Sequence, residues 1–182
     1  MGRREEIQRA AYDLMGVKGL ESVHARTVAQ KLDINHATVH YYFPTRVDLL
    51  VGVADFAALQ IEQDRQTLDL VDTGRDGIES ELSLAEAYSR AQSRLGKVVI
   101  GLAAASVSEP KLVEPLQNVW NAFARVGNSA IPETKIRKSC PYANTDLFAC
   151  TLFGVVAGSQ ITHQKISAEE MVEAMHSSFF KK

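Results

Sequence analysis

Hydrogen-bonding side chains are concentrated in one short stretch of the chain, residues 36–42, with the sequence HATVHYY. It combines two imidazoles, a hydroxyl and two phenols with one alanine that is small enough for close approach. If the stretch is helical, one face carries its outward groups, which are His36, Ala37, Thr38, His40 and Tyr41. Such groups can bond to base edges and phosphate oxygens, and the major groove of DNA admits one α-helix. The stretch therefore predicts a surface that contacts DNA.

The flanking residues predict how this surface is positioned. Residues 25–32 are expected to form a helix, residues 33–35 a tight turn, and residues 36–42 a second helix for which Asn35 is the N-cap. Val39 and Phe43 would anchor the second helix in the core, and Pro44 would end it. This is the layout of a helix-turn-helix, in which the second helix enters the groove.

Three further residues are suited to phosphate oxygens, which position a protein on DNA without reading its sequence. Thr38 and Tyr42 carry hydroxyls. Arg46 would stand at the start of a long helix, where its charge opposes the helix dipole, and a nearby phosphate would explain that choice. The start itself is indicated by Thr45 and Asp48, which match the S/T-x-x-D/E capping pattern.

The stretch GLESVHARTVAQKLDINHATVHYYFPTRVDLL, residues 19–50, resembles the DNA-binding domain of the TetR family of transcriptional regulators. The resemblance reaches back through a first helix and covers roughly residues 3–55. It adds Arg26 and Thr27 as residues near the DNA backbone and groove. The expected DNA-binding residues are then Arg26, Thr27, Asn35, His36, Ala37, Thr38, His40, Tyr41, Tyr42 and Arg46.

Three residues depart from the family pattern. His24 stands where Ser or Thr usually caps the first helix of the motif, so that this cap is weaker or is supplied by Ser22. Asp33 replaces the usual turn glycine, and aspartate tolerates the left-handed conformation better than most residues. His40 replaces a common tyrosine, which alters the expected base preference.

The whole chain is expected to be all-α, with about nine helices, because no segment alternates with a period of two for long enough to predict a strand. Helical patterns cover residues 3–17 and 46–70, from a capping box at 83–86 through about 106, from 110 to 126, and over 145–164 and 168–180. Residues 128–144 are interpreted as a loop. Residues 1–48 form the predicted helix-turn-helix domain, and residues 49–182 a helical domain.

The resemblance implies what the second domain does. In the family layout the last two helices, about 145–164 and 168–180, form a homodimer interface, where Gly154, Ala157 and Gly158 would permit close approach. A homodimer would bind a near-palindromic DNA operator and be released by a small molecule. The apolar composition favours an apolar or aromatic effector, and the candidate pocket walls are Phe56, Tyr88, Trp120 and Phe123, each of which could equally be ordinary core.

The composition is compatible with this interpretation but is weak evidence for it. The chain has 182 residues and a net charge of −2. Residues 1–50 carry seven Lys or Arg and six Asp or Glu, which gives +1. We expect a cytoplasmic protein, since no apolar run approaches the ~20 residues that span a bilayer. Cys140 and Cys150 do not make a disulfide framework and are expected in a loop and in the core, although a redox pair stays open.

The rival interpretation is a helical-bundle enzyme or an interaction module without sequence-specific DNA binding. Such an enzyme would need a catalytic constellation, and the sequence offers no Cys-His-Asp, paired-carboxylate, metal or phosphate-loop pattern. His36 and His40 are four residues apart, but no third ligand is fixed nearby, so no metal or cofactor is expected. Salt-dependent binding to generic duplex DNA would separate the two interpretations.

Overall fold

The computed structural model describes residues 2–67, 86–88, 93–130 and 145–162, together with Ser167 and Glu170. Within these residues every regular element is helical, which confirms the all-α prediction. The elements are α1 (Arg3–Lys18), η1 (Leu20–Ser22), α2 (Ala25–Leu32), α3 (His36–Tyr42), α4 (Arg46–Thr67), α6 (Arg94–Ser106), η2 (Pro110–Leu112), α7 (Val113–Ala130) and α9 (Thr145–Thr162).

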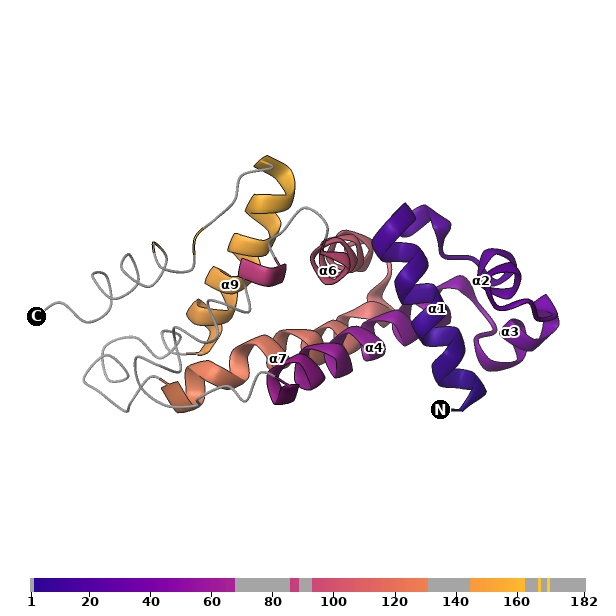
Figure 1. Cartoon of the computed structure of the whole chain (residues 1–182), viewed down its shortest axis with the longest axis horizontal. Helices are drawn as coiled ribbons and strands as arrows, with labels where there is room; N and C mark the ends of the chain where they lie inside the picture. The colour runs from indigo at the N-terminus through magenta and orange to yellow at the C-terminus, as the bar shows by residue number, and fades with distance from the viewer. Residues whose placement is uncertain are drawn as a thin grey trace, which may run out of the picture. The chain divides into compact units, whose positions relative to one another are not determined.

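The chain divides into two compact units. The first contains Met1–Glu62 and Arg94–Val119, and the second contains Gln63–Ser93 and Trp120–Lys182. The first unit therefore adds α6 and the start of α7 to the helix-turn-helix. Figure 1 shows α1 with α6 on one side and with α2 and α3 on the other.

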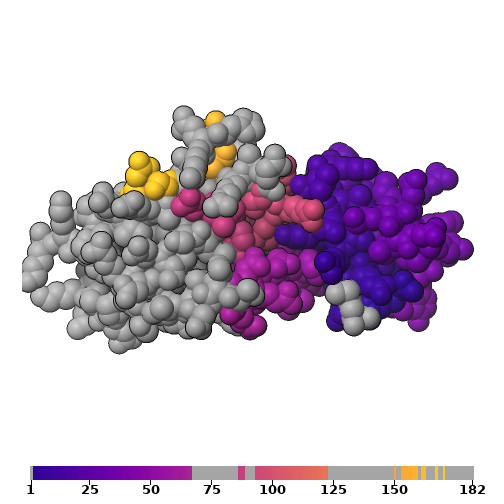
Figure 2. Space-filling view, in the orientation of Figure 1, coloured from indigo at the N-terminus to yellow at the C-terminus, as the bar shows by residue number. Residues whose placement is uncertain are grey.

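The core of the first unit follows the helical periodicity of its sequence. The apolar face predicted for α1 is buried, and so are the inward residues of α2 and α3. The fully buried side chains include Ile7, Met15, Val23, Val28, Val39, Phe43, Leu49, Leu50, Ile61, Leu102 and Leu112. In Figure 2 the helices at the N-terminal end of the chain form a closely packed body.

Three elements differ from the sequence-based expectation. The helix α7 continues to Ala130 and so enters the predicted loop of residues 128–144. In α4, the apolar pattern predicted Leu50, Ala54, Ala57 and Ile61 as inward residues; they are buried, but so are Leu49 and Val53, so the helix is covered over a wider arc than expected. The helix predicted from 83–86 through about 106 is not continuous: residues 86–88 are helical, Ser93 is not, and α6 begins at Arg94. Serine is a preferred residue in front of a helix, which accounts for a start at this point.

Candidate nucleic-acid interface

The turn between α2 and α3 depends on one residue in an unusual conformation. Asp33 has φ 53° and ψ 48°, which is the left-handed region. The backbone N–H groups of Asp33 and Ile34 donate to the carbonyls of Gln30 (3.4 Å) and Ala29 (3.0 Å) at the end of α2. The prediction that aspartate would preserve this turn is confirmed, and the turn fixes the direction in which α3 leaves α2.

The start of α3 is fixed by Asn35. Its Oδ1 accepts a hydrogen bond of 2.9 Å from the backbone N–H of Ala37. The predicted N-cap is therefore confirmed, and it orients an exposed amide beside the first turn of the helix. A DNA contact by Asn35 stays a prediction.

The other face of α3 is held in the core. Val39 and Phe43 are 0% and 1% exposed, so the predicted anchor is confirmed. The guanidinium of Arg4, on α1, lies 4.6 Å from the centre of the Phe43 ring, and its Nη1 donates to the carbonyl of Tyr42 at 3.2 Å. Arg4 therefore braces the C-terminal end of α3, a role that no spacing in the sequence indicated.

With its anchor buried, α3 presents the predicted polar face outward. His36, Ala37, His40 and Tyr41 are exposed, whereas Thr38 and Tyr42 are half-buried. The side chain of Tyr41 is 80% exposed. Its ring packs edge-on against Tyr42 with the centroids 5.1 Å apart. The rings of His36 and His40 are also edge-on, at 6.1 Å.

A shallow hollow of about 390 Å³ joins α2 to the start of α3. It brings Arg26 of α2 together with Asn35 and His36, two other residues of the predicted contact set. Its lining residues are Arg26, Ala29, Gln30, Ile34, Asn35 and His36. A guanidinium, two amides and an imidazole therefore line the hollow beside Ala29 and Ile34, a set of groups that suits an anionic, hydrogen-bonding partner.

Thr27 is engaged within the protein. Its Oγ1 accepts from the backbone N–H of His24 at 3.2 Å and lies within donating distance of the carbonyls of Ser22 (2.5 Å) and His24 (2.8 Å). The hydroxyl of Ser22 donates to the carbonyl of Gly19 instead, so the suggestion that Ser22 caps α2 is wrong. Thr27 secures the start of α2, and its contact with DNA stays a prediction.

Arg46 is likewise engaged within the protein. Its Nε donates to the carbonyl of Val23 at 3.1 Å, and Nη2 donates to the carbonyl of Leu20 at 3.1 Å. Nη2 also lies 3.4 Å from Oε1 of Glu21. These bonds tie the start of α4 to the segment between α1 and α2. They explain a cation at this helix start without a phosphate, and the predicted phosphate contact stays untested.

The capping box that begins α4 is confirmed. The backbone N–H of Thr45 donates to Oδ2 of Asp48 at 3.0 Å, and the N–H of Asp48 donates to Oγ1 of Thr45 at 3.1 Å. The Thr45 hydroxyl also donates to the carboxylate, at 2.7 Å. This hydroxyl is the largest cause of a lowered pKa for Asp48; burial opposes the shift, and Lys111 adds to it.

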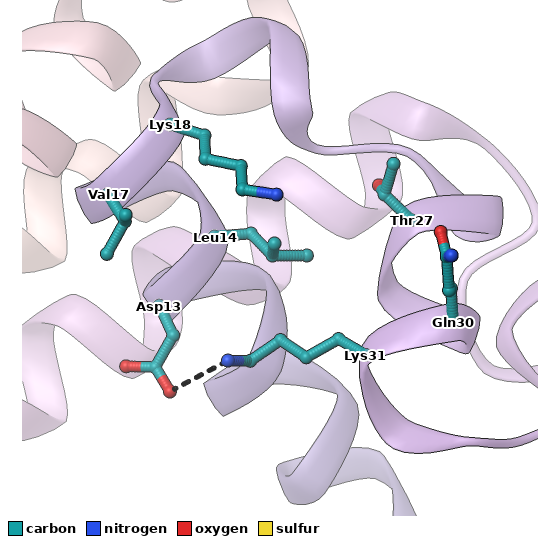
Figure 3. A pocket seen from close by; sticks show the side chains of 7 residues that line it. All are labelled: Asp13, Leu14, Val17, Lys18, Thr27, Gln30 and Lys31. Carbon is teal, nitrogen blue, oxygen red and sulfur yellow. Dashed lines mark ion pairs between the residues drawn. The ribbon is translucent and has the colours of Figure 1, made fainter.

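A second hollow, of about 360 Å³, lies between α1 and α2 and was not indicated by the sequence. Figure 3 shows Leu14 between the side chains of Lys18 and Lys31, with the Asp13 carboxylate beside the Lys31 amino group, 3.8 Å away. The same carboxylate lies 3.0 Å from Nη1 of Arg94 on α6. Asp13 thus connects α1, α2 and α6 within the first unit.

The four residues suggested for an effector pocket have different surroundings. Phe56 belongs to the first unit, where its ring packs against Tyr12 with the centroids 5.1 Å apart. In the second unit, the hydroxyl of Tyr88 donates to Oδ2 of Asp64 at 2.9 Å, and the ring of Trp120 lies 6.4 Å from that of Phe153. The side chain of Phe123 lies outside the described residues, and a pocket formed by these residues stays a prediction.

Of the predicted dimer interface, the structure describes α9 but not residues 171–182. Gly154 and Gly158 face open space in the single chain, and Ile161 is 74% exposed. Cys150 is a free, exposed thiol, so the expectation of a core cysteine is wrong in the isolated chain; Cys140 lies outside the described residues. The described part of the chain has no helix that is long and apolar enough to cross a membrane, and no cluster of three potential metal ligands.

Comparison with known proteins identifies the same N-terminal region. Residues 7–53 match the family model described as bacterial regulatory proteins, tetR family. No curated protein sequence matches the chain.

Solved structures match the chain over nearly its whole length. A protein from Rhodococcus sp., described as a TetR-family transcriptional regulator, is 20% identical with a TM-score of 0.70, and the match covers 97% of this chain and 95% of that one. A transcriptional regulator from Streptomyces coelicolor A3(2) is 17% identical with a TM-score of 0.75, covering 98% and 99%. The multidrug binding protein EbrR, complexed with imidazole, is 17% identical with a TM-score of 0.71, covering 97% and 94%. At these identities the likeness is one of fold.

Proposed function

We propose that this chain, whose residues 7–53 match the family model of bacterial regulatory proteins of the tetR family, regulates transcription by binding a DNA operator through the exposed face of α3. The observation that carries the proposal is the two-sided character of that helix. Val39 and Phe43 are buried, while His36, His40 and Tyr41 project from the opposite side. A helix anchored in this way can enter the major groove while α2 crosses the backbone.

The proposed regulator acts as a homodimer on a near-palindromic operator. Two recognition helices related by a two-fold axis must lie about one DNA turn, ~34 Å, apart to read two half-sites. The open face of α9 around Gly154 and Gly158 supports the proposal that α9, with the segment after it, forms the dimer contact. We expect such a protein to be located in the cytoplasm, where it can bind its operator.

We further propose that the protein is a repressor that a small apolar or aromatic molecule releases from DNA. The likeness in fold to EbrR, which was solved with imidazole, supports a small-molecule effector. α4 is one helix that begins beside the capping box and contributes residues to both compact units. An effector that binds better to one orientation of this helix would shift the population of DNA-binding conformations.

A selection from a library of random duplexes tests the DNA-binding proposal. The purified full chain should enrich a near-palindromic sequence, and affinity for that sequence should fall steeply as salt rises, because bound phosphates release counterions. Enrichment of no sequence, with affinity indifferent to salt, would rule out an operator-binding function.

The effector proposal requires the selected operator. Addition of a panel of apolar and aromatic compounds should weaken operator binding for at least one of them. If operator affinity is the same with every compound while the compounds' own binding to the protein is measurable, sensing through DNA release is excluded.

A further inference from the structure

The hollow between α1 and α2 combines the two kinds of surface that an amphipathic anion needs. One is apolar: Leu14 and Val17 line the hollow one helical turn apart on α1, and Val17 is 63% exposed. The other is cationic, because Lys18 of α1 and Lys31 of α2 line the same hollow. The volume of about 360 Å³ lies at the lower end of the ~300–1,000 Å³ that small-molecule sites occupy.

Both ammonium groups have hydrogen-bond donors to offer a ligand. Figure 3 shows the Lys18 side chain extending from α1 toward α2, and that of Lys31 extending from α2 toward α1. Among the residues that the structure describes, Lys18 makes no ion pair. The Lys31 amino group lies 3.8 Å from the Asp13 carboxylate. That distance is longer than a hydrogen bond, so the three N–H donors of Lys31 remain for another acceptor.

The Asp13 carboxylate offsets only part of this positive charge. Its Oδ1 accepts a hydrogen bond of 3.0 Å from Nη1 of Arg94, which is a third cation beside the two lysines. Three positive charges therefore stand against one negative charge, and an incoming anion is attracted. Gln30 also lines the hollow and adds an amide donor.

We propose that this hollow binds a small carboxylate with an apolar body, the carboxylate between Lys18 and Lys31 and the body against Leu14 and Val17. The inference does not rest on the proposed function. Neither lysine belongs to the predicted DNA-contact set, and none of the four residues suggested for an effector pocket lines this hollow. A ligand that joins α1 to α2 stabilises the first unit by mass action.

The apolar wall is what favours a small amphipathic molecule over a DNA phosphate at this place. The two lysines alone would suit phosphate oxygens equally well. A phosphate leaves the exposed side chain of Val17 in water, whereas an alkyl or aromatic body removes apolar surface from water, which is favourable.

Hexanoate is the probe for this site, with hexanol and hexylammonium as controls of the same chain length. Each compound is titrated into the isotope-labelled full chain, and its affinity is read from the backbone amide signals of residues 13–18 and 27–31. Binding in the hollow is thereby separated from binding elsewhere, and the same spectra show whether a variant is folded. At low salt, hexanoate should bind about fivefold more tightly than hexanol, the combined effect of two exposed charge pairs. Hexylammonium should bind more weakly than hexanol.

Substitutions around the hollow should change hexanoate binding in opposite directions. Lys18→Gln and Lys31→Gln should each reduce the preference for hexanoate over hexanol, whereas Lys97→Gln, at an exposed lysine of α6, should keep it. Asp13→Asn should strengthen hexanoate binding, because it removes the carboxylate that competes for Lys31. Hexanoate that binds no more tightly than hexanol, or that binds the double lysine variant as tightly as the unmodified chain, would overturn the inference.

The selected operator separates a small-molecule site from a phosphate contact. The double variant Lys18→Gln and Lys31→Gln should bind the operator with an unchanged dependence on salt, because the lysines do not contact DNA. A slope of log affinity against log salt that falls by about two in this variant would mark both lysines as phosphate contacts and refute the site.

Discussion

For Arg46, the sequence suggested a phosphate partner, but the structure shows backbone carbonyls as its partners. A cation in the first turn of a helix opposes the helix dipole, and from sequence alone a phosphate was the simplest compensation. In the structure, the carbonyls of Leu20 and Val23 take its hydrogen bonds. The types and spacing of residues 35–48 predicted the N-cap, the buried anchor and the capping box. They could not predict the partners of Arg46, Arg4 and Thr27, because those depend on how separate segments pack.

Replacement of Arg46 by alanine should destabilise the first unit by about 1–3 kcal/mol, since the carbonyls of Leu20 and Val23 lose the hydrogen bonds that the guanidinium donates to them in a half-buried site. Arg46→Lys should restore only part of this, because an ammonium cannot reproduce the fork of a guanidinium. Urea unfolding measures the effect, with the exposed Arg9→Ala as the control. Unchanged stability of Arg46→Ala, combined with weaker DNA binding, would show that Arg46 serves only as a phosphate contact.

The lowered pKa of Asp48 gives stability a defined dependence on pH. A carboxyl whose folded pKa lies below its unfolded value of 3.8 stabilises the fold above that value, and the contribution is lost as pH falls through the folded pKa. Asp48→Asn should therefore cost about 1 kcal/mol at pH 7, the usual magnitude for a helix cap. The difference from the unmodified chain should shrink in acid, below the unfolded pKa of Asp48. A difference in unfolding free energy that stays constant from neutral pH to strong acid would contradict this assignment.

At the scale of elements, the sequence predicted α2 and α3 to their end residues, because caps, a turn and a proline mark each boundary. It placed α1 and the start of α4 almost as well. The crossing of α1 and α6 could not be read from periodicity, since it joins segments far apart in the chain. That crossing is close: a side chain at Gly16 would meet Cβ of Arg94 at 2.6 Å, and one at Gly101 would meet the end of Met15 at 2.6 Å.

The two glycines should respond differently to alanine. Gly16→Ala forces α1 against the backbone end of the Arg94 side chain, 3.1 Å from its Cα, and should destabilise the fold by about 1–3 kcal/mol as overpacking does. Gly101→Ala meets the far end of the flexible Met15 side chain at 2.6 Å and Cβ of Leu20 only at 3.9 Å, so strain should be offset by the ~1 kcal/mol that alanine contributes to a helix relative to glycine. Thermal unfolding of the two variants compares them directly. Equal loss of stability at both positions would mean that the crossing tolerates no added methyl group, however flexible the neighbour.

At the scale of the whole molecule, composition and net charge said little about DNA, since a net charge of −2 announces no nucleic-acid partner. The arrangement of α3, with one side buried and the other exposed, is much more informative. The sequence-based boundary between residues 48 and 49 separates the helix-turn-helix from the rest of the chain. The first compact unit is larger than this predicted domain, because it also includes α6 and the start of α7. The proposed effector and dimer surfaces depend on how the C-terminal helices pack, which neither periodicity nor composition encodes.

The most direct measurement compares two identical substitutions at exposed alanines, one on the predicted DNA face and one away from it. Ala37→Glu places a carboxylate on α3, and Ala104→Glu places one on α6; both positions are exposed, so both variants should fold. In titrations of the selected operator, Ala37→Glu should weaken binding at least about tenfold through repulsion from phosphates and loss of close approach. Ala104→Glu should bind as the unmodified chain does. Equal affinity of all three proteins for the operator would contradict the central claim that α3 is the surface that reads DNA.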